Sequence, residues 1–121
     1  MSNEKAKGTF GEALAADFLE KEGYTILKKN YLKNGGELDI VAFKNGVVVF
    51  IEVKTRYSYL MGEPAAAVDT FKQLKIIKGA EGFMSENEKL HSCSFRFDVI
   101  EVMPKESKRI NHIINAFEVE E

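Results

Sequence analysis

Apolar positions recur along the chain with two different periods, and the change of period divides it into helices and strands. Apolar residues share one face at helical spacing over residues 9–22 and again over residues 68–85. Thr9 and Glu12 have the spacing of a capping box at the start of the first helix, and Gly23 follows its end. The strands, marked by β-branched and aromatic residues, are expected at 24–32, as two strands within 36–56, at 95–102 and at 110–119.

The segments between these elements read as loops. Residues 57–67 contain Gly62 and Pro64, and residues 85–92 are polar. The resulting order is α-β-β-β-α-β-β, in which the second helix crosses over between two strands that should lie parallel. The pattern therefore predicts an α/β fold with a central mixed sheet flanked by helices. A chain of 121 residues suits one domain, so residues 1–121 are expected to form a single unit.

The two strands within 36–56 are expected to form a tight hairpin. Asn45-Gly46 between apolar runs is the strongest short signal for a two-residue turn. With these two residues as the loop, Asp39 lies opposite Glu52 and Glu37 lies opposite Lys54. One face of the hairpin is then apolar near the turn and charged at the far end. The other face is wholly apolar and should be core; it carries residues 38, 40, 42, 47, 49, 51 and 53.

Opposed carboxylates on a sheet repel each other unless something neutralises them. Cβ atoms directly opposite on two strands are about 5 Å apart, so Asp39 and Glu52 can share one ion. Oxygen-only ligands favour Mg²⁺ or Mn²⁺, and these ions keep waters and leave room for a phosphate. Lys54, on the same face, would then reach that phosphate. The alternative is an open, solvated sheet face with Glu37 and Lys54 as a plain cross-strand ion pair.

Two polar residues share the apolar faces of the predicted helices. Gln73 lies on the same face as Ile76 and Ile77, and it would point toward the acidic end of the hairpin if the helix covers that face. A buried structural glutamine explains it equally well. Glu12 shares the face of Ala15, and it either points inward to the site or only caps the helix.

Basic and aromatic residues near the hairpin are candidates for contact with nucleic acid. Lys72, Lys75 and Arg56 would form a basic rim around the acidic centre, and Tyr57 would stack on a base. Taken alone, each of these lysines is better explained as a solvated surface residue, and local packing is an alternative explanation for Tyr57. Asp98 is expected to be a structural ion-pair partner.

Composition narrows the range of functions. The net charge of −2 gives no support for a protein that coats duplex DNA, so a nucleic-acid contact must come from a local patch. Cys93 is the sole cysteine, which leaves neither an intrachain disulfide nor a Cys-rich metal site. No apolar run is long enough to span a bilayer, and the first residues lack a signal-peptide pattern. A cytoplasmic location without membrane contact is expected.

Asp39 and the triplet Glu52-Val53-Lys54 resemble the D-x(n)-E-x-K core of the PD-(D/E)XK nuclease superfamily. The wider pattern resembles the YraN-type family of small predicted endonucleases from Gly8 to about Phe117. The segments that carry this likeness are "GTFGEALAADFLEKEGYTIL", "NY", "GELDIVA", "VFIEVKTR", "GEPAAAVD", "KQLKI" and "FDVIEV".

The resemblance implies a restriction-endonuclease-like α-β-β-β-α-β core, similar to that of Holliday-junction resolvases. It implies Asp39 and Glu52 as metal ligands and Lys54 as the catalytic lysine. Glu12 matches the acid of the first helix, and Gln73 matches the polar residue of the later helix. The chain departs from the pattern at Leu38, where the superfamily's name has proline, and at Leu32, where the family tends to carry a basic residue.

The main hypothesis is a Mg²⁺- or Mn²⁺-dependent endonuclease acting on structured or damaged DNA, with DNA favoured over RNA. The rival hypothesis is a binding module with a nuclease-like fold that recognises nucleic acid or a DNA-processing protein without cutting. A purely structural protein would leave the opposed carboxylates unexplained. A domain of this size would cover a two-fold DNA junction most naturally as a homodimer.

Overall fold

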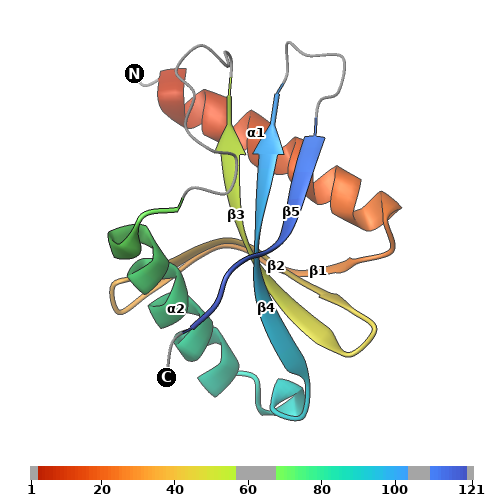
Figure 1. The fold of residues 1–121 in the computed structure, drawn as a ribbon, viewed down its shortest axis with the longest axis vertical. Helices are drawn as coiled ribbons and strands as arrows, with labels where there is room; N and C mark the ends of the chain where they lie inside the picture. Colours follow the sequence, from red (N-terminus) through yellow and green to blue (C-terminus); the bar gives the residue numbers. More distant parts are fainter. Residues whose placement is uncertain (1–2, 57–67, 104–109, 120–121) are drawn as a thin grey trace.

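The computed structural model describes residues 3–56, 68–103 and 110–119, and for residues 3–9 only the backbone (Figure 1). The predicted order of helices and strands is confirmed, with one additional short 3-10 helix, η1, in the segment expected to be a loop. The elements are α1 (Asn3–Lys21), β1 (Thr25–Lys33), β2 (Gly36–Lys44), β3 (Val47–Thr55), α2 (Thr70–Ser85), η1 (Glu88–Leu90), β4 (Ser94–Val102) and β5 (Ile110–Phe117). The loop predicted at 57–67 lies outside the described residues.

The expected start of the first helix is wrong. The helix begins at Asn3, so Thr9 lies inside it and does not cap it. Threonine and glutamate three positions apart share one side of any helix, and their spacing alone therefore does not mark a helix start. The correction removes the capping role as the explanation for Glu12.

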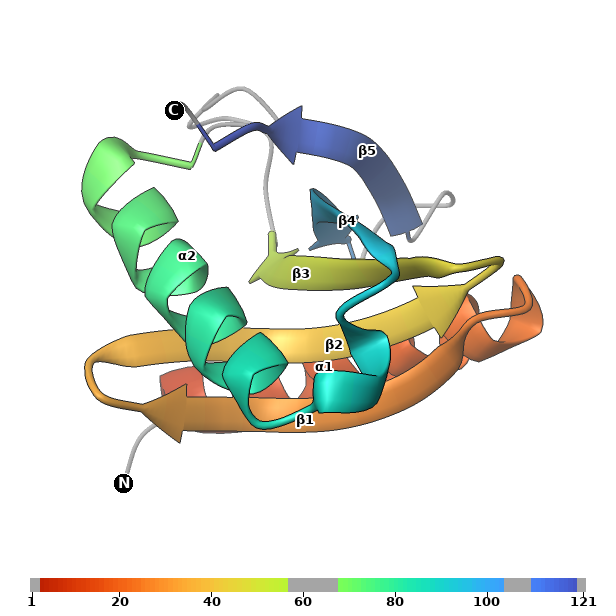
Figure 2. The same cartoon turned by 90° about the horizontal axis from the view of Figure 1, so that it is seen from below.

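The five strands form one mixed sheet in the order β1-β2-β3-β4-β5. β3 and β4 are parallel, and the other neighbouring pairs are antiparallel. α2 supplies the predicted crossover between the two parallel strands. The two helices lie on opposite faces of the sheet (Figure 2). No helix in the described part of the chain is long and apolar enough to cross a membrane.

Each helix packs on its own hydrophobic core. α1 buries Ala15, Ala16 and Leu19 against one face of the sheet. α2 buries Ile76, Ala80 and Phe83 against the other face. The strand residues that complete the α1-side core are Ile40, Ala42, Val49, Ile51, Ile100 and Val102. Those of the α2-side core are Tyr31, Leu38, Val41, Val48, Phe50, Phe97 and Val99. With cores on both faces, the sheet is held rigid up to its polar end.

Two glycines allow α2 to cross β2 in backbone contact. A Cβ atom on Gly36 would lie 2.6 Å from Gly79 Cα and 2.7 Å from the Lys78 carbonyl carbon. A Cβ atom on Gly79 would lie 2.8 Å from Leu38 Cγ. This close crossing fixes the distance between the middle of α2 and the start of β2.

Replacing Gly36 by alanine is expected to lower the free energy of unfolding by about 1–3 kcal/mol, the usual cost of overpacking a close contact. The added methyl group meets backbone atoms of α2, which cannot rotate away as a side chain could. Urea denaturation of the variant and the wild type measures the difference. Equal stability of the two proteins would show that α2 does not rest on this contact.

Candidate active site

The strands β2 and β3 stop pairing at their polar end. Paired Cα positions run from Lys44–Val47 to Ile40–Ile51, which confirms the predicted turn and register over this stretch. Beyond Ile40, the amide N–H of Val53 donates to the carboxylate of Asp39 at 2.8 Å. Asp39 therefore turns its side chain toward the backbone of β3 and lies in the sheet plane, where the two strands diverge.

The same irregularity changes the face of Leu38. The alternating pattern predicts Leu38 on the wholly apolar face with Ile40, but it packs against α2 in the opposite core. Strict alternation holds only while a strand stays regular, and the strand is irregular at Asp39. The prediction for Leu38 is thus wrong, and the reason lies at the site itself.

The carboxylates of Asp39 and Glu52 are in contact. Burial, the charge of Asp39 and a hydrogen bond between the two side chains together raise the pKa of Glu52 to about 8, although the charges of Lys72 and Lys54 oppose the rise. Like charges held this close cannot both ionise without a counter-charge. The structure therefore brings together the two residues predicted to share an ion.

Lys72 of α2 reaches over the sheet into this acidic cluster. Its Nζ lies 2.5 Å from Glu37 Oε1 and 3.7 Å from Glu52 Oε2. The hydrogen bond from Lys72 holds the pKa of Glu37 below its usual value. The sequence predicts Lys72 on the outer rim, whereas the structure places its ammonium group among the carboxylates.

α1 contributes an acid from the other side of the sheet. Burial and the nearby charge of Asp39 raise the pKa of Glu12, while a hydrogen bond with Asn30 opposes the rise. Asn30 is in the left-handed backbone region, with φ of 52°. Asparagine tolerates that conformation better than most residues, so β1 can adopt it at the residue that hydrogen-bonds Glu12.

Lys54 completes the cluster. It lies near the end of β3 and pairs in register with Glu101 of β4. Its positive charge acts on Glu52 and opposes the rise in that residue's pKa. Two lysines from different elements thus flank the carboxylates: Lys54 from the sheet and Lys72 from α2.

Other predicted site residues lie in different surroundings. The side-chain amide of Gln73 donates to the carbonyl oxygen of Val68 at 2.7 Å, which fastens the start of α2. The Arg56 guanidinium forms an ion pair with the buried Glu101. Lys75 Nζ lies 4.8 Å from the centroid of the Phe71 ring. Tyr57 lies outside the described residues. The catalytic role of Gln73 and the nucleic-acid contacts of Arg56, Lys75 and Tyr57 stay predictions.

The arrangement fits a hard divalent cation held by two protein ligands. Within the described residues, no group of three or more His, Cys, Asp or Glu side chains is placed to hold a metal ion. Mg²⁺ does not need such a group, because it binds through one or two carboxylates and keeps several waters. Asp39 and Glu52, touching each other and partly buried, supply that donor set.

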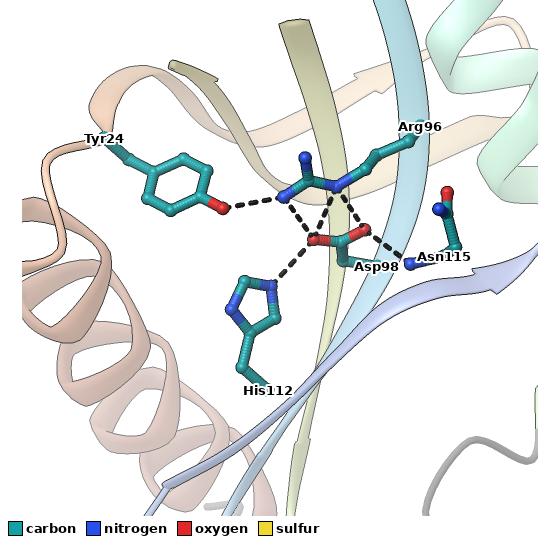
Figure 3. A network of polar contacts seen from close by, with 5 residues as sticks. All are labelled: Tyr24, Arg96, Asp98, His112 and Asn115. Atoms are coloured by element: carbon teal, nitrogen blue, oxygen red, sulfur yellow. Dashed lines mark hydrogen bonds and ion pairs between the residues drawn. The ribbon is translucent and has the colours of Figure 1, made fainter. Parts of the chain in front are cut away.

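A second polar network lies on the α1 face of the sheet (Figure 3). Asp98 of β4 is buried and accepts hydrogen bonds from Arg96, from His112 Nε2 at 2.7 Å and from the Asn115 amide at 3.1 Å. Arg96 also donates to the hydroxyl of Tyr24 at 2.6 Å. The network ties β5 to β4 and to the connection between α1 and β1. The prediction that Asp98 is a structural ion-pair partner is confirmed.

Sequence reasoning missed two of these relations. The first is the ion pair between Lys72 and Glu37. It depends on how α2 lies over the sheet, which the Gly36–Gly79 contact sets, and a contact between distant residues leaves no periodic signal in the sequence. His112 lies fourteen residues from Asp98 on the neighbouring strand. The alternation along β4 and β5 predicts which face of the sheet each side chain occupies. It does not predict which residues lie opposite each other, because the pairing of β4 with β5 is irregular near Phe97.

The mixed sheet, its helix on each face and the polar end of β2 and β3 define an α/β protein with a restriction-endonuclease-like core, in the order α1-β1-β2-β3-α2-β4. Residues 11–102 match the model of the uncharacterised protein family UPF0102, and the chain belongs to that family. It is 48% identical over 118 residues to a UPF0102 protein of Trichlorobacter lovleyi, covering 95% of this chain and 92% of that protein.

Two further relatives agree with this membership. A UPF0102 protein of Caldanaerobacter subterraneus is 45% identical, with 95% of this chain and 97% of that protein aligned. A UPF0102 protein of Clostridium botulinum is 43% identical, with 93% and 94% aligned. The predicted resemblance to the YraN-type family is confirmed as membership of UPF0102.

Proposed function

We propose that this protein is a metal-dependent endonuclease of the PD-(D/E)XK superfamily that hydrolyses phosphodiester bonds, with DNA as the substrate. The observation that carries the proposal is the contact between Asp39 and Glu52 at the point where β2 and β3 diverge, flanked by Lys54 and Lys72. Two acids and a lysine at the end of a hairpin suit the chemistry of phosphate hydrolysis.

Asp39 and Glu52 would hold one Mg²⁺ or Mn²⁺. When bound, the ion would polarise the phosphate and lower the pKa of a coordinated water. The hydrogen bond from the Val53 amide fixes the Asp39 carboxylate, so the ligand is oriented before any ion arrives. Glu12, next to Asp39, adds negative charge to the same position.

The lysines would act on the reacting phosphate. Lys54 extends from the rigid end of β3 and would stabilise the negative charge that develops on the phosphate oxygens. Lys72 neutralises Glu37 and Glu52 in the protein alone. With a cation on the carboxylates, its ammonium group would be available to the substrate. We propose that the protein acts in the cytoplasm. A homodimer would cover a substrate with two-fold symmetry.

Cleavage of a defined set of substrates tests the proposal. Purified protein with Mn²⁺ or Mg²⁺ is expected to cut at least one of single-stranded, duplex, flap or four-way DNA, and EDTA is expected to stop it. An RNA strand of the same sequence serves as the comparison for substrate type. Failure to cut any of the DNA substrates under either ion would refute the proposed activity.

A thermal melt tests the metal site without relying on cleavage. At a Mn²⁺ concentration ten times the dissociation constant, binding is expected to stabilise the wild type by about 1.4 kcal/mol. Asp39→Asn removes one ligand charge and is expected to abolish this gain. Asp17 is an exposed residue of α1, so Asp17→Asn is the control and should keep the full stabilisation by Mn²⁺. Equal Mn²⁺ stabilisation of wild type and Asp39→Asn would contradict the shared site.

A further inference from the structure

Two exposed apolar side chains and one partly exposed lysine near the acidic cluster have no role in the core or in the proposed chemistry. Phe71 and Lys75 belong to the first two turns of α2, and Leu32 belongs to β1. Phe71 is 69% exposed and Leu32 is 73% exposed. The Lys75 ammonium lies over the Phe71 ring, 4.8 Å from its centroid. Other large apolar side chains of this chain are also exposed, but here an exposed aromatic ring has a lysine ammonium held over its face.

Leu32 and Lys75 line a hollow that also includes Glu37 of the acidic cluster, and Phe71 adjoins it through its contact with Lys75. The hollow has a volume of about 360 Å³ and is lined by Leu32, residues 33–37 and Lys75. Glu37, on its wall, is the residue that binds Lys72, and Lys72 in turn reaches Glu52. In Figure 2 the β1–β2 turn and the start of α2 lie at the same end of the sheet. A ligand in the hollow would thus contact Glu37, which Lys72 links to Glu52, one of the two proposed metal ligands.

The chemistry of this surface suits a nucleotide whose base is unpaired. An aromatic ring offers a face on which any base can stack, and a lysine beside it offers a charge for the adjoining phosphate. In a duplex the base faces are already stacked on one another and are not available to a protein side chain. The volume of the hollow is at the lower end of the range of small-ligand sites, which matches a single nucleotide.

We propose that Phe71, Lys75 and Leu32 form a stacking platform for unpaired nucleotides next to the phosphate to be cut, so that the substrate class is nucleic acid with a single-stranded segment. The inference rests on the proposed nuclease function, because it assigns the neighbouring site to the same substrate. Lys75 binds the phosphate that flanks the stacked base, and Leu32 contacts its sugar or base edge.

Binding of hydrolysis-resistant phosphorothioate oligonucleotides tests this platform in the full-length protein. The probes are a short oligothymidylate and a blunt duplex of the same length, each followed by fluorescence anisotropy. The wild type is expected to bind the single strand more tightly than the duplex. Phe71→Ala should weaken single-strand binding by roughly 5- to 150-fold, the loss expected for one base–aromatic stack, and should change duplex binding little. Phe71→Trp should restore it.

Two further variants sharpen the result. Lys75→Gln should reduce the slope of log affinity against log salt by about 0.7, the value for one phosphate contact on a single strand. Phe95→Ala removes an exposed aromatic residue near the start of β4, away from the acidic cluster, and should leave binding unchanged. A base analogue whose fluorescence falls on stacking should be quenched by the wild type and not by Phe71→Ala.

The outcomes separate this inference from the proposed function. Single-strand binding by Phe71→Ala equal to that of the wild type would overturn the platform, as would a wild type that prefers the duplex. A change of oligomeric state in Phe71→Ala with unchanged oligonucleotide binding would assign the surface to a second copy of the chain and would also overturn it. Tight, Phe71-dependent binding without cleavage of any substrate supports the platform and refutes the nuclease.

Discussion

Replacing Asp98 by asparagine is expected to lower the free energy of unfolding by about 3–5 kcal/mol, the usual cost of removing one partner of a buried ion pair. The Asp98 side chain is fully buried and accepts from Arg96, His112 and the Asn115 amide (Figure 3). An amide in its place accepts through one oxygen and presents N–H donors to groups that are themselves donors. The Arg96 guanidinium would then keep its charge beside a neutral neighbour.

The same residue should make stability depend on pH in the acid range. Burial by itself would raise the pKa of Asp98, but the hydrogen bonds from His112 and Arg96 outweigh it and lower the pKa below its usual value. A carboxylate whose folded pKa is depressed contributes stability above its unfolded pKa, near 4, and loses it as the pH falls through the folded value. The difference in free energy of unfolding between wild type and Asp98→Asn should therefore be largest at neutral pH and should disappear in strong acid.

Urea denaturation at neutral pH and at a series of acid pH values measures both effects. The matched control is Asp17→Asn, which removes an exposed i,i+4 ion pair with Lys21 on α1. That pair should contribute no more than about 0.5 kcal/mol. Equal losses for the two aspartate variants, or a gap that does not change with pH, would show that the Asp98 network does not hold β5 in place.

The sequence predicts the fold of this protein well because each element carries a local signal. Asn45 and Gly46 have the positive φ values, 49° and 80°, that a two-residue hairpin turn requires, and this turn sets the register of β2 and β3. That register ends at Ile40 and Ile51, and it brings Asp39, the next residue of β2, close to Glu52, the next residue of β3. The Asp39–Glu52 pair could thus be predicted from the sequence, because both residues lie on one hairpin.

The rest of the site depends on contacts between distant elements. Lys72 reaches Glu37 only because Gly36 and Gly79 let α2 approach β2, and Glu12 reaches Asp39 only because α1 crosses the same end of the sheet. Periodicity assigns a side chain to a face but not to a partner. Local regularity also fails at Asp39, where the strand turns its carboxylate into the sheet plane and moves Leu38 to the other core.

Lys54→Ala is expected to reduce cleavage by roughly 10²–10³, the size of effect seen when one preorganised charge is removed from a transition state. In the proposed mechanism Lys54 would act on the reacting phosphate and would not bind the ion, so Mn²⁺ should stabilise the variant as much as the wild type. The variant should also fold: the Glu37 carboxylate that the sequence placed opposite Lys54 keeps its ion pair with Lys72. A thermal melt checks this before any rate is compared.

Single-turnover cleavage and anisotropy on the same substrate separate an enzyme from a binding module with a nuclease-like fold. In an enzyme, Lys54→Ala changes the rate far more than the affinity, because the lysine acts mainly on charge that develops in the transition state. In a binding module, Lys54 is one phosphate contact among several, and its loss weakens binding with no rate to lose. Lys89→Ala, an exposed lysine of η1, is the control and should match the wild type in both measurements. A wild type that cuts no substrate with Mn²⁺, together with a Lys54→Ala variant that binds more weakly, would establish the module and exclude the nuclease.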